Sequence, residues 1–77
     1  MDKGQVALDV LSKLSGKPAA EIGREMDLVG ELGIDSPKAL QLLVELEDQL
    51  GIEISDESAA RMEKVSDVLE FLEALPA

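Results

Sequence analysis

Apolar residues recur along the chain at intervals of three and four, the spacing that places side chains on one face of a helix. This spacing predicts helices over residues 2–15, 36–50 and 65–75, and a very short helix from about 56 to 62. No stretch alternates between apolar and polar positions for long enough to indicate a strand. Since each helix is apolar on one side only, we expect an all-α fold, a small antiparallel four-helix bundle.

The second predicted helix has an inward face and an outward face. Leu40 and Val44 fall on the edge of its apolar arc, one turn apart, whereas Gln41, Glu45 and Asp48 are expected to point to solvent. The residues expected to face the core are Val6, Ala7, Val10, Leu11 and Leu14 in the first helix, Ala39, Leu42, Leu43, Leu46 and Leu50 in the second, and Val65, Val68, Leu69, Leu72 and Leu75 in the last.

A long connection over residues 16–35 separates the first two predicted helices, because its glycines and Pro18 prevent a continuous helix. A short helical turn is expected near 19–22. Gly16 and Gly51 are expected to end the helices before them, Ser55 or Asp56 to cap the third helix, and Pro76 to end the last. The apolar residues expected to hold the connection against the core are Ile22, Met26, Leu28, Val29, Leu32 and Ile34.

The tripeptide Asp35-Ser36-Pro37 precedes the second predicted helix. Pro is favoured at the first helical position, which indicates Ser36 as the N-cap, with Asp35 as the alternative. A phosphodiester on the Ser36 hydroxyl would meet unpaired N–H groups and a favourable helix dipole. Asp35 could help an incoming enzyme to bind a metal or to position the hydroxyl. Taken alone, however, such a serine more often serves only as a cap.

The composition narrows the classes of function. The 77 residues carry a net charge of −10, which argues against nucleic acid and anionic membranes as partners and favours proteins with basic patches. Without Cys or His there is no disulfide, no thiol nucleophile, no His general base and no usual zinc site, so an enzyme is not expected. Neither a signal peptide nor a membrane-spanning run is present in the sequence, so we expect a cytoplasmic protein. We also expect it to be a monomer.

Two motifs flank the second predicted helix: Glu31-Leu32-Gly33-Ile34-Asp35-Ser36 before it and Ile52-Glu53-Ile54-Ser55-Asp56-Glu57 after it. Together with the acidic helix between them, they make the chain resemble the acyl carrier protein family over essentially its whole length. The resemblance implies one free-standing acyl-carrier domain over residues 1–77. It also implies that 4′-phosphopantetheine is attached covalently to Ser36, and that no residue is catalytic or binds a metal.

The same resemblance implies how such a chain works. Acyl intermediates would be held as thioesters on the arm and presented to enzymes of fatty acid or related lipid synthesis, after a phosphopantetheinyl transferase has attached the arm. The alternatives are a carrier of polyketide, aminoacyl or peptidyl groups, and an acidic helical adaptor without a prosthetic group.

The second helix is the partner-recognition helix of the family. Leu40 and Val44 would form an apolar strip beside the attachment point, or else belong to the core. Three positions differ from the usual family pattern: Pro37 replaces a Leu, and Lys38 and Gln41 replace acidic residues. These differences indicate a specialised carrier with its own partners, or neutral drift on a surface helix. The expected partner-binding residues are Asp35, Pro37, Leu40, Val44, Glu45, Glu47 and Asp48.

Overall fold

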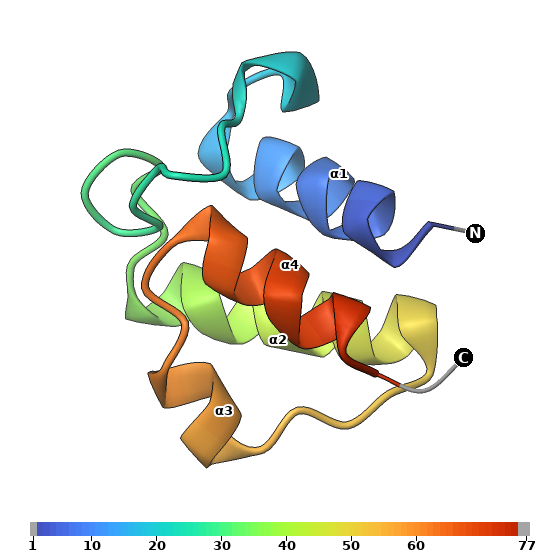
Figure 1. The fold of residues 1–77 in the computed structure, drawn as a ribbon. Coiled ribbons are helices and arrows are strands. Elements are labelled where there is room, and N and C mark those ends of the chain that lie inside the picture. The colour runs from blue at the N-terminus through green and yellow to red at the C-terminus, as the bar shows by residue number, and fades with distance from the viewer. Residues whose placement is uncertain (1, 76–77) are drawn as a thin grey trace.

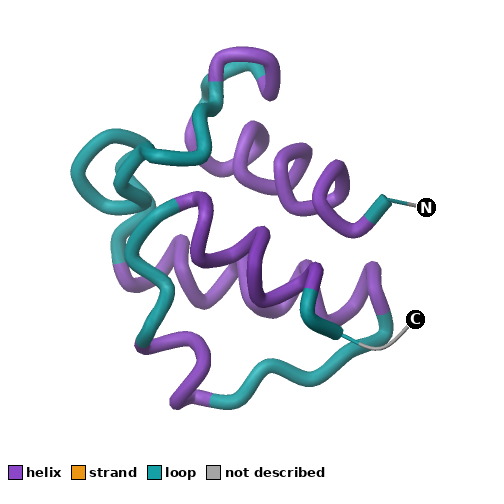
Figure 2. Tube along the Cα trace, in the orientation of Figure 1, coloured by secondary structure: helices purple, strands orange, loops and turns teal. Residues whose placement is uncertain are grey.

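Four α-helices and one turn of 3-10 helix form the regular structure of residues 2–75, the part of the chain that this computed structural model describes. They are α1 (Lys3–Ser15), η1 (Ala19–Glu21), α2 (Ser36–Leu50), α3 (Asp56–Ala60) and α4 (Val65–Glu73) (Figure 1). Within those residues no segment is a strand (Figure 2). The predicted all-α fold, with three longer helices, one short helix and a long first connection, is therefore confirmed.

The directions of the helices differ in one respect from a fully antiparallel bundle. In Figure 1, α1 runs from right to left, whereas α2 and α4 both run from left to right. The segment between α2 and α4 contains α3 and brings the chain back to the end of the molecule at which α2 began. Helix α1 packs against both α2 and α4, so these three helices enclose the core.

The core is aliphatic, and no polar or charged side chain of the described residues is buried in it. Ala39 and Leu50, predicted to face inward, are partly buried and pack against its edge. Leu43, predicted to face inward as well, is only partly buried. Val29, predicted to anchor the long connection, is 68% exposed, so that prediction was wrong. The buried residues are Val6, Ala7, Val10, Leu11, Ile22, Leu28, Leu32, Ile34, Leu42, Leu46, Val65, Val68, Leu69 and Leu72.

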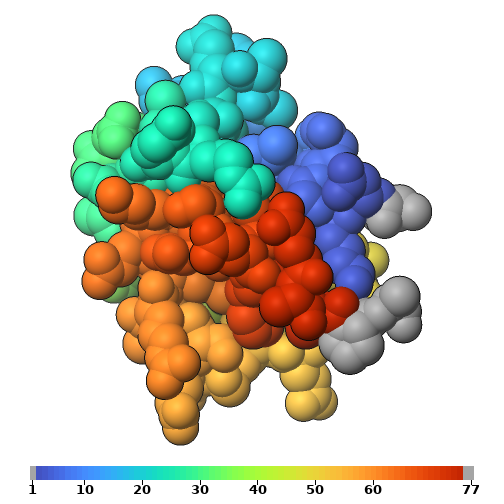
Figure 3. Space-filling view, in the orientation of Figure 1, coloured from blue at the N-terminus to red at the C-terminus, as the bar shows by residue number. Residues whose placement is uncertain are grey.

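Backbone hydrogen bonds hold the long connection against the start of α4. Leu28 N–H donates to the carbonyl of Glu63 at 2.9 Å, and Val65 N–H donates to the carbonyl of Met26 at 3.0 Å. Ile34 N–H closes the following loop by donating to the carbonyl of Leu28 at 2.8 Å. Figure 3 shows α4 across the middle of one face, with the connection on one side of it and α3 on the other. The segment that leads to α2 is thus ordered without being helical.

The C-terminal ends of α1 and α2 and the N-cap of α3 agree with the predicted caps, although two helices are shorter than predicted. Gly16 and Gly51 follow α1 and α2 with φ of 80° and 64°, a conformation that glycine adopts without strain. The side chain of Ser55 caps α3. Helix α3 ends at Ala60 rather than near Met62, and α4 ends at Glu73 rather than near Leu75. Pro76, predicted to end α4, lies outside the described residues.

Candidate functional site

The start of α2 is capped by Asp35. Its Oδ1 accepts a hydrogen bond from Lys38 N–H at 3.2 Å, and its carbonyl accepts one from Ala39 N–H at 2.7 Å. Ser36 is therefore the first helical residue and Pro37 the second. The prediction of Ser36 as the N-cap was wrong, and the alternative, Asp35, is correct. The carboxylate has the reach that a cap needs, because an N-cap side chain must meet the N–H two or three positions later.

Ser36 is exposed, and within residues 2–75 its hydroxyl makes no hydrogen bond. A serine that served as the cap would have its oxygen engaged by the backbone. Because Asp35 takes that task, the oxygen of Ser36 is left accessible at the electropositive end of a 15-residue helix. The site therefore combines a free nucleophilic oxygen with a helix dipole that favours a phosphate next to it.

The chain reaches Ser36 through a tight turn at Gly33. Gly33 has φ of 67°, its N–H donates to the carbonyl of Val29 at 3.1 Å, and its carbonyl accepts from Asp35 N–H at 3.0 Å. Apart from the adjacent residues of the chain, no atom lies within 4 Å of the place that a Cβ on Gly33 would occupy. The next residue, Ile34, is almost fully buried at 1% exposure. A buried anchor thus holds the turn, and the space in front of the turn is open.

The residues at the start of α2 fit a phosphodiester on Ser36, although they offer it fewer unpaired N–H groups than the sequence led us to expect. Lys38 N–H is already bonded to Asp35, and Pro37 has no N–H, so fewer backbone donors are available than predicted. The dipole remains, and Lys38, two residues after Ser36, adds an exposed positive charge. The negative charge of Asp35 is offset in this way, and the attached group would extend into open solvent.

The predicted partner-binding residues fall into two groups. Pro37 and Asp48 are exposed, and Leu40 and Val44 are 64% and 53% exposed, which shows that these two are not core residues. The second group consists of Glu45 and Glu47, whose side chains contact other parts of the chain. Glu45, predicted to point to solvent, is partly buried, and its Oε1 pairs with Lys13 Nζ on α1 at 2.8 Å. Glu47 Oε2 accepts a hydrogen bond from Ile54 N–H at 2.9 Å.

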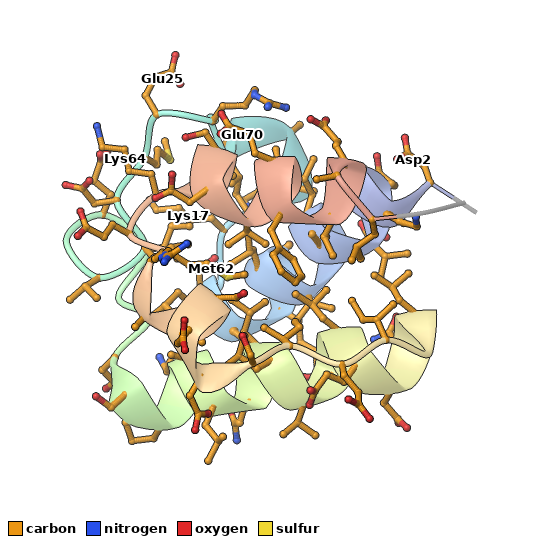
Figure 4. The ribbon with its side chains drawn as sticks, turned by 60° about the horizontal axis from the view of Figure 1, so that its bottom comes forward. Asp2, Lys17, Glu25, Met62, Lys64 and Glu70 are labelled. Atoms are coloured by element: carbon orange, nitrogen blue, oxygen red, sulfur yellow. The ribbon has the colours of Figure 1, made fainter. Side chains whose placement is uncertain are left out.

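Two open hollows next to Phe71, the only aromatic residue, were not foreseen from the sequence. Their volumes are about 290 and 470 Å³. The first is lined by residues of α3, of α4 and of the segment between them, and the second by residues of α3 and α4, by Glu47 of α2 and by the link before α3. Neither is lined by Ser36 or by residues 33–35 before it. In Figure 4, Glu70 lies on the side of α4 away from α2, and Met62 follows α3. The lining residues are Glu47, Glu53, Ile54, Ser55, Ser58, Arg61, Met62, Asp67, Glu70 and Phe71.

Two further kinds of site are not found in residues 2–75. Their Asp and Glu side chains form no group of three or more arranged to hold a metal ion. None of their helices has both the length and the apolar character needed to cross a membrane.

Comparison with known proteins bears on the identity of the site. The model of the family described as the phosphopantetheine attachment site matches residues 5–72. An acyl carrier protein of Solidesulfovibrio magneticus is 33% identical over 73 residues, which cover 95% of this chain and 94% of that protein. An acyl carrier protein of Exiguobacterium is 34% identical over 76 residues, covering 95% and 96%.

The comparison of folds also points to acyl carrier proteins. A solved structure from Mycobacterium tuberculosis, described as a candidate acyl carrier protein, superposes with a TM-score of 0.84 at 30% identity and covers 92% of this chain and 95% of its own. Four helices, a match to the phosphopantetheine family over most of the chain and full-length relatives lead to one conclusion. The chain belongs to the acyl carrier protein family, whose members are carriers rather than enzymes and work through a 4′-phosphopantetheine arm.

Proposed function

We propose that Ser36 is the residue to which the 4′-phosphopantetheine arm is attached, and that residues 1–77 act as one carrier domain. The observation that carries this proposal is the exposed Ser36 hydroxyl, which is free because Asp35 caps α2 in its place. The position lies inside the segment that matches the attachment-site family. The open space at Gly33 leaves room for an enzyme to reach the oxygen.

Attachment requires only that the Ser36 oxygen be presented and deprotonated. Ser36 Oγ forms a bond to the pantetheine-bearing phosphorus of coenzyme A, the pyrophosphate P–O bond breaks, and adenosine 3′,5′-bisphosphate leaves. The Oγ proton passes to a base of the transferase, because this chain has no His and no base bonded to Ser36. The thiol at the end of the arm then supplies the position at which an acyl group is held as a thioester.

The finer function that we propose is acyl transport for fatty acid or related lipid synthesis, by a cytoplasmic monomer. Support comes from the named relatives and from a surface charge of −10, which attracts enzymes with basic surfaces over a distance. Leu40 and Val44 provide exposed apolar contacts within about two turns of Ser36. Such a surface suits weak, rapidly exchanging complexes, in which charge raises the association rate.

The attachment is tested by incubating the protein with a phosphopantetheinyl transferase and coenzyme A and recording the intact mass. We expect the mass to rise by one phosphopantetheine group in the wild type and in Ser58→Ala, a matched control in α3, and to stay unchanged in Ser36→Ala. If several transferases leave the wild type unmodified, or if Ser36→Ala is modified equally, Ser36 is not the attachment residue. An acidic adaptor would then be the better description.

The cargo needs a second measurement. The modified protein is isolated from its own cells, and the groups on the arm are identified by mass spectrometry. We expect linear acyl groups. Polyketide, aminoacyl or peptidyl groups would assign the chain to another pathway. They would not contradict the proposal that the arm is attached to Ser36.

A further inference from the structure

Most carboxylates near Ser36 are engaged within the chain. Between residues 31 and 48, Asp48 is the acid for which the structure of residues 2–75 gives no such contact. The engaged contacts are Glu31 Oε1 with Asp27 N–H at 3.2 Å, Asp35 Oδ1 with Lys38 N–H at 3.2 Å, Glu45 Oε1 with Lys13 Nζ at 2.8 Å, and Glu47 Oε2 with Ile54 N–H at 2.9 Å. A partner that approaches Ser36 therefore meets fewer free acids than the net charge suggests.

Lys38 has the opposite character. It is exposed, and its ammonium group forms no ion pair with residues 2–75. Lys38, Gln41 and Glu45 follow one another at intervals of three and four residues and so form one row along α2. That row consists of a cation, a neutral amide and an acid already paired with Lys13. This row of α2 therefore carries no net negative charge, and the ammonium group of Lys38, which forms no ion pair, lies two residues after Ser36.

The next row of α2 is apolar near Ser36. Leu40, Val44 and Asp48 follow one another at intervals of four residues. Together with Val29 in the preceding loop, Leu40 and Val44 are the large apolar side chains of residues 2–75 that are exposed. Figure 1 shows that this loop lies at the end of the molecule where α2 begins. Its closure by the Gly33–Val29 and Ile34–Leu28 hydrogen bonds keeps Val29 outside the core.

We propose that Val29, Leu40, Val44 and Lys38 form the docking surface of this carrier, and that it fits a partner that presents an apolar surface beside a carboxylate. The occupant to which we assign it is the phosphopantetheinyl transferase that must cover Ser36. The inference rests on the proposed function, since attachment at Ser36 is what brings that enzyme to this surface. This surface would not fit a transferase whose contact surface is basic throughout, because Lys38 needs a carboxylate opposite it. It also extends beyond α2, because it includes Val29 in the preceding loop.

The net charge and the contact charges act at different distances. A charge of −10 steers a basic protein toward this chain from afar, but salt screens charges beyond roughly 8–10 Å under physiological conditions. At contact, the exposed ammonium of Lys38 is the nearest cation in sequence to Ser36, and a carboxylate facing it gains both charge attraction and a hydrogen bond. Local pairs of this kind determine the orientation of the complex more than its attraction at long range.

The test measures steady-state modification of Ser36 by the phosphopantetheinyl transferase of the organism that encodes this chain. Lys38→Glu is expected to raise KM about tenfold, because it places two like charges opposite each other. Val29→Ser is expected to raise KM roughly threefold to fivefold, since it removes an exposed apolar contact. Lys3→Glu, a control for net charge, makes the same change in charge in the first turn of α1 and should change KM less than about twofold.

Dissociation constants of the same substitutions in the Ser36→Ala background separate docking from chemistry, and they should change in parallel with KM. A lower KM for Lys38→Glu would show that the partner presents a basic patch, and the inference would be wrong. Equal KM values for wild type, Lys38→Glu and Val29→Ser would also overturn it while leaving attachment at Ser36 intact. Failure of the wild type to be modified by any transferase would overturn the proposed function and this inference together.

Discussion

The carboxylate of Glu47 on α2 accepts a hydrogen bond from the N–H of Ile54, seven residues later, at 2.9 Å. The carbonyl of the same residue accepts from the N–H groups of Gly51 and Ile52. One residue therefore fixes both the end of α2 and the extended link that follows. Glu47 was predicted to contact partners, yet its side-chain oxygen is turned toward this link, which makes it a structural contact in the free protein.

Replacement of Glu47 by Ala should lower the free energy of unfolding by about 1.5 kcal/mol, because it removes a charge-assisted hydrogen bond and leaves a partly buried N–H unpaired. Asp48→Ala removes the neighbouring acid, which is exposed, and should cost less than about 0.5 kcal/mol. Urea denaturation measures both values. Hydrogen exchange at the Ile54 amide should be faster in Glu47→Ala alone. Equal stability of the two variants would mean that the hydrogen bond contributes nothing.

The start of α4 contains an acid whose titration should be visible in stability. Asp67 Oδ2 accepts hydrogen bonds from the N–H groups of Glu63 at 2.9 Å and Lys64 at 3.0 Å. These two backbone hydrogen bonds, with a smaller contribution from the charge of Lys64, lower the pKa of Asp67 below its ordinary value of 3.8, while desolvation opposes them. Since the folded pKa lies below the unfolded one, the stabilisation is complete above pH 3.8 and is lost as the pH falls through the folded pKa.

We therefore expect Asp67→Ala to lower the free energy of unfolding by about 1 kcal/mol at neutral pH, because it removes the two hydrogen bonds that this third residue of α4 accepts from the backbone before the helix. The difference from the wild type should shrink as the pH falls below 3.8. Glu70→Ala, on the exposed side of α4, provides a control on the same helix (Figure 4). Thermal unfolding at several pH values gives the comparison, and a difference that is independent of pH would contradict the assigned titration.

The periodic parts of the sequence could be predicted well, and the reasons are physical. The bounds of α2 follow from the repeat that buries Leu42 and Leu46 and from Gly51, which adopts the left-handed conformation after the last turn. The choice of N-cap could not be made in the same way. Asp35 and Ser36 both have suitable side chains, and only the backbone geometry of Asp35 decides which oxygen reaches Lys38 N–H.

The aperiodic parts were harder to predict for a different reason. Whether Val29 or Leu28 faces the core depends on the hydrogen bond between Leu28 and Glu63, two residues far apart in sequence. No local pattern records such a contact. The inward orientation of Glu47 has the same origin, because its partner Ile54 lies beyond the end of the helix. The position of Ser36 at the start of α2 could be predicted from the sequence, but the contacts of the charged side chains around it could be seen only in the structure.

Salt should stabilise the protein. With 17 acidic and 7 basic residues, repulsion among carboxylates opposes the compact state, while the ion pairs Lys13–Glu45 and Arg24–Glu73 offset only part of it. We expect the melting temperature to rise when salt or millimolar divalent cations are added, because screening weakens the many repulsions between distant carboxylates more than it weakens these two close ion pairs. Scanning calorimetry over a salt series measures the effect. A melting temperature that stays constant or falls would show that self-repulsion is not a significant cost.

Gly33 should matter for modification as well as for stability, and Gly51 allows the two effects to be separated. Both have positive φ, 67° and 64°, and at both the place that an added methyl group would take is free of other atoms within 4 Å, adjacent residues aside. Substitution by Ala should therefore cost about 1 kcal/mol at each site, for conformational reasons alone. Only Gly33 connects the buried Ile34 with the turn before Ser36, so only Gly33→Ala should slow the attachment of phosphopantetheine, by roughly threefold or more. Rates of modification measured on both variants, at a temperature where each is folded, decide the matter: equal rates would show that the turn at Gly33 does not position the serine.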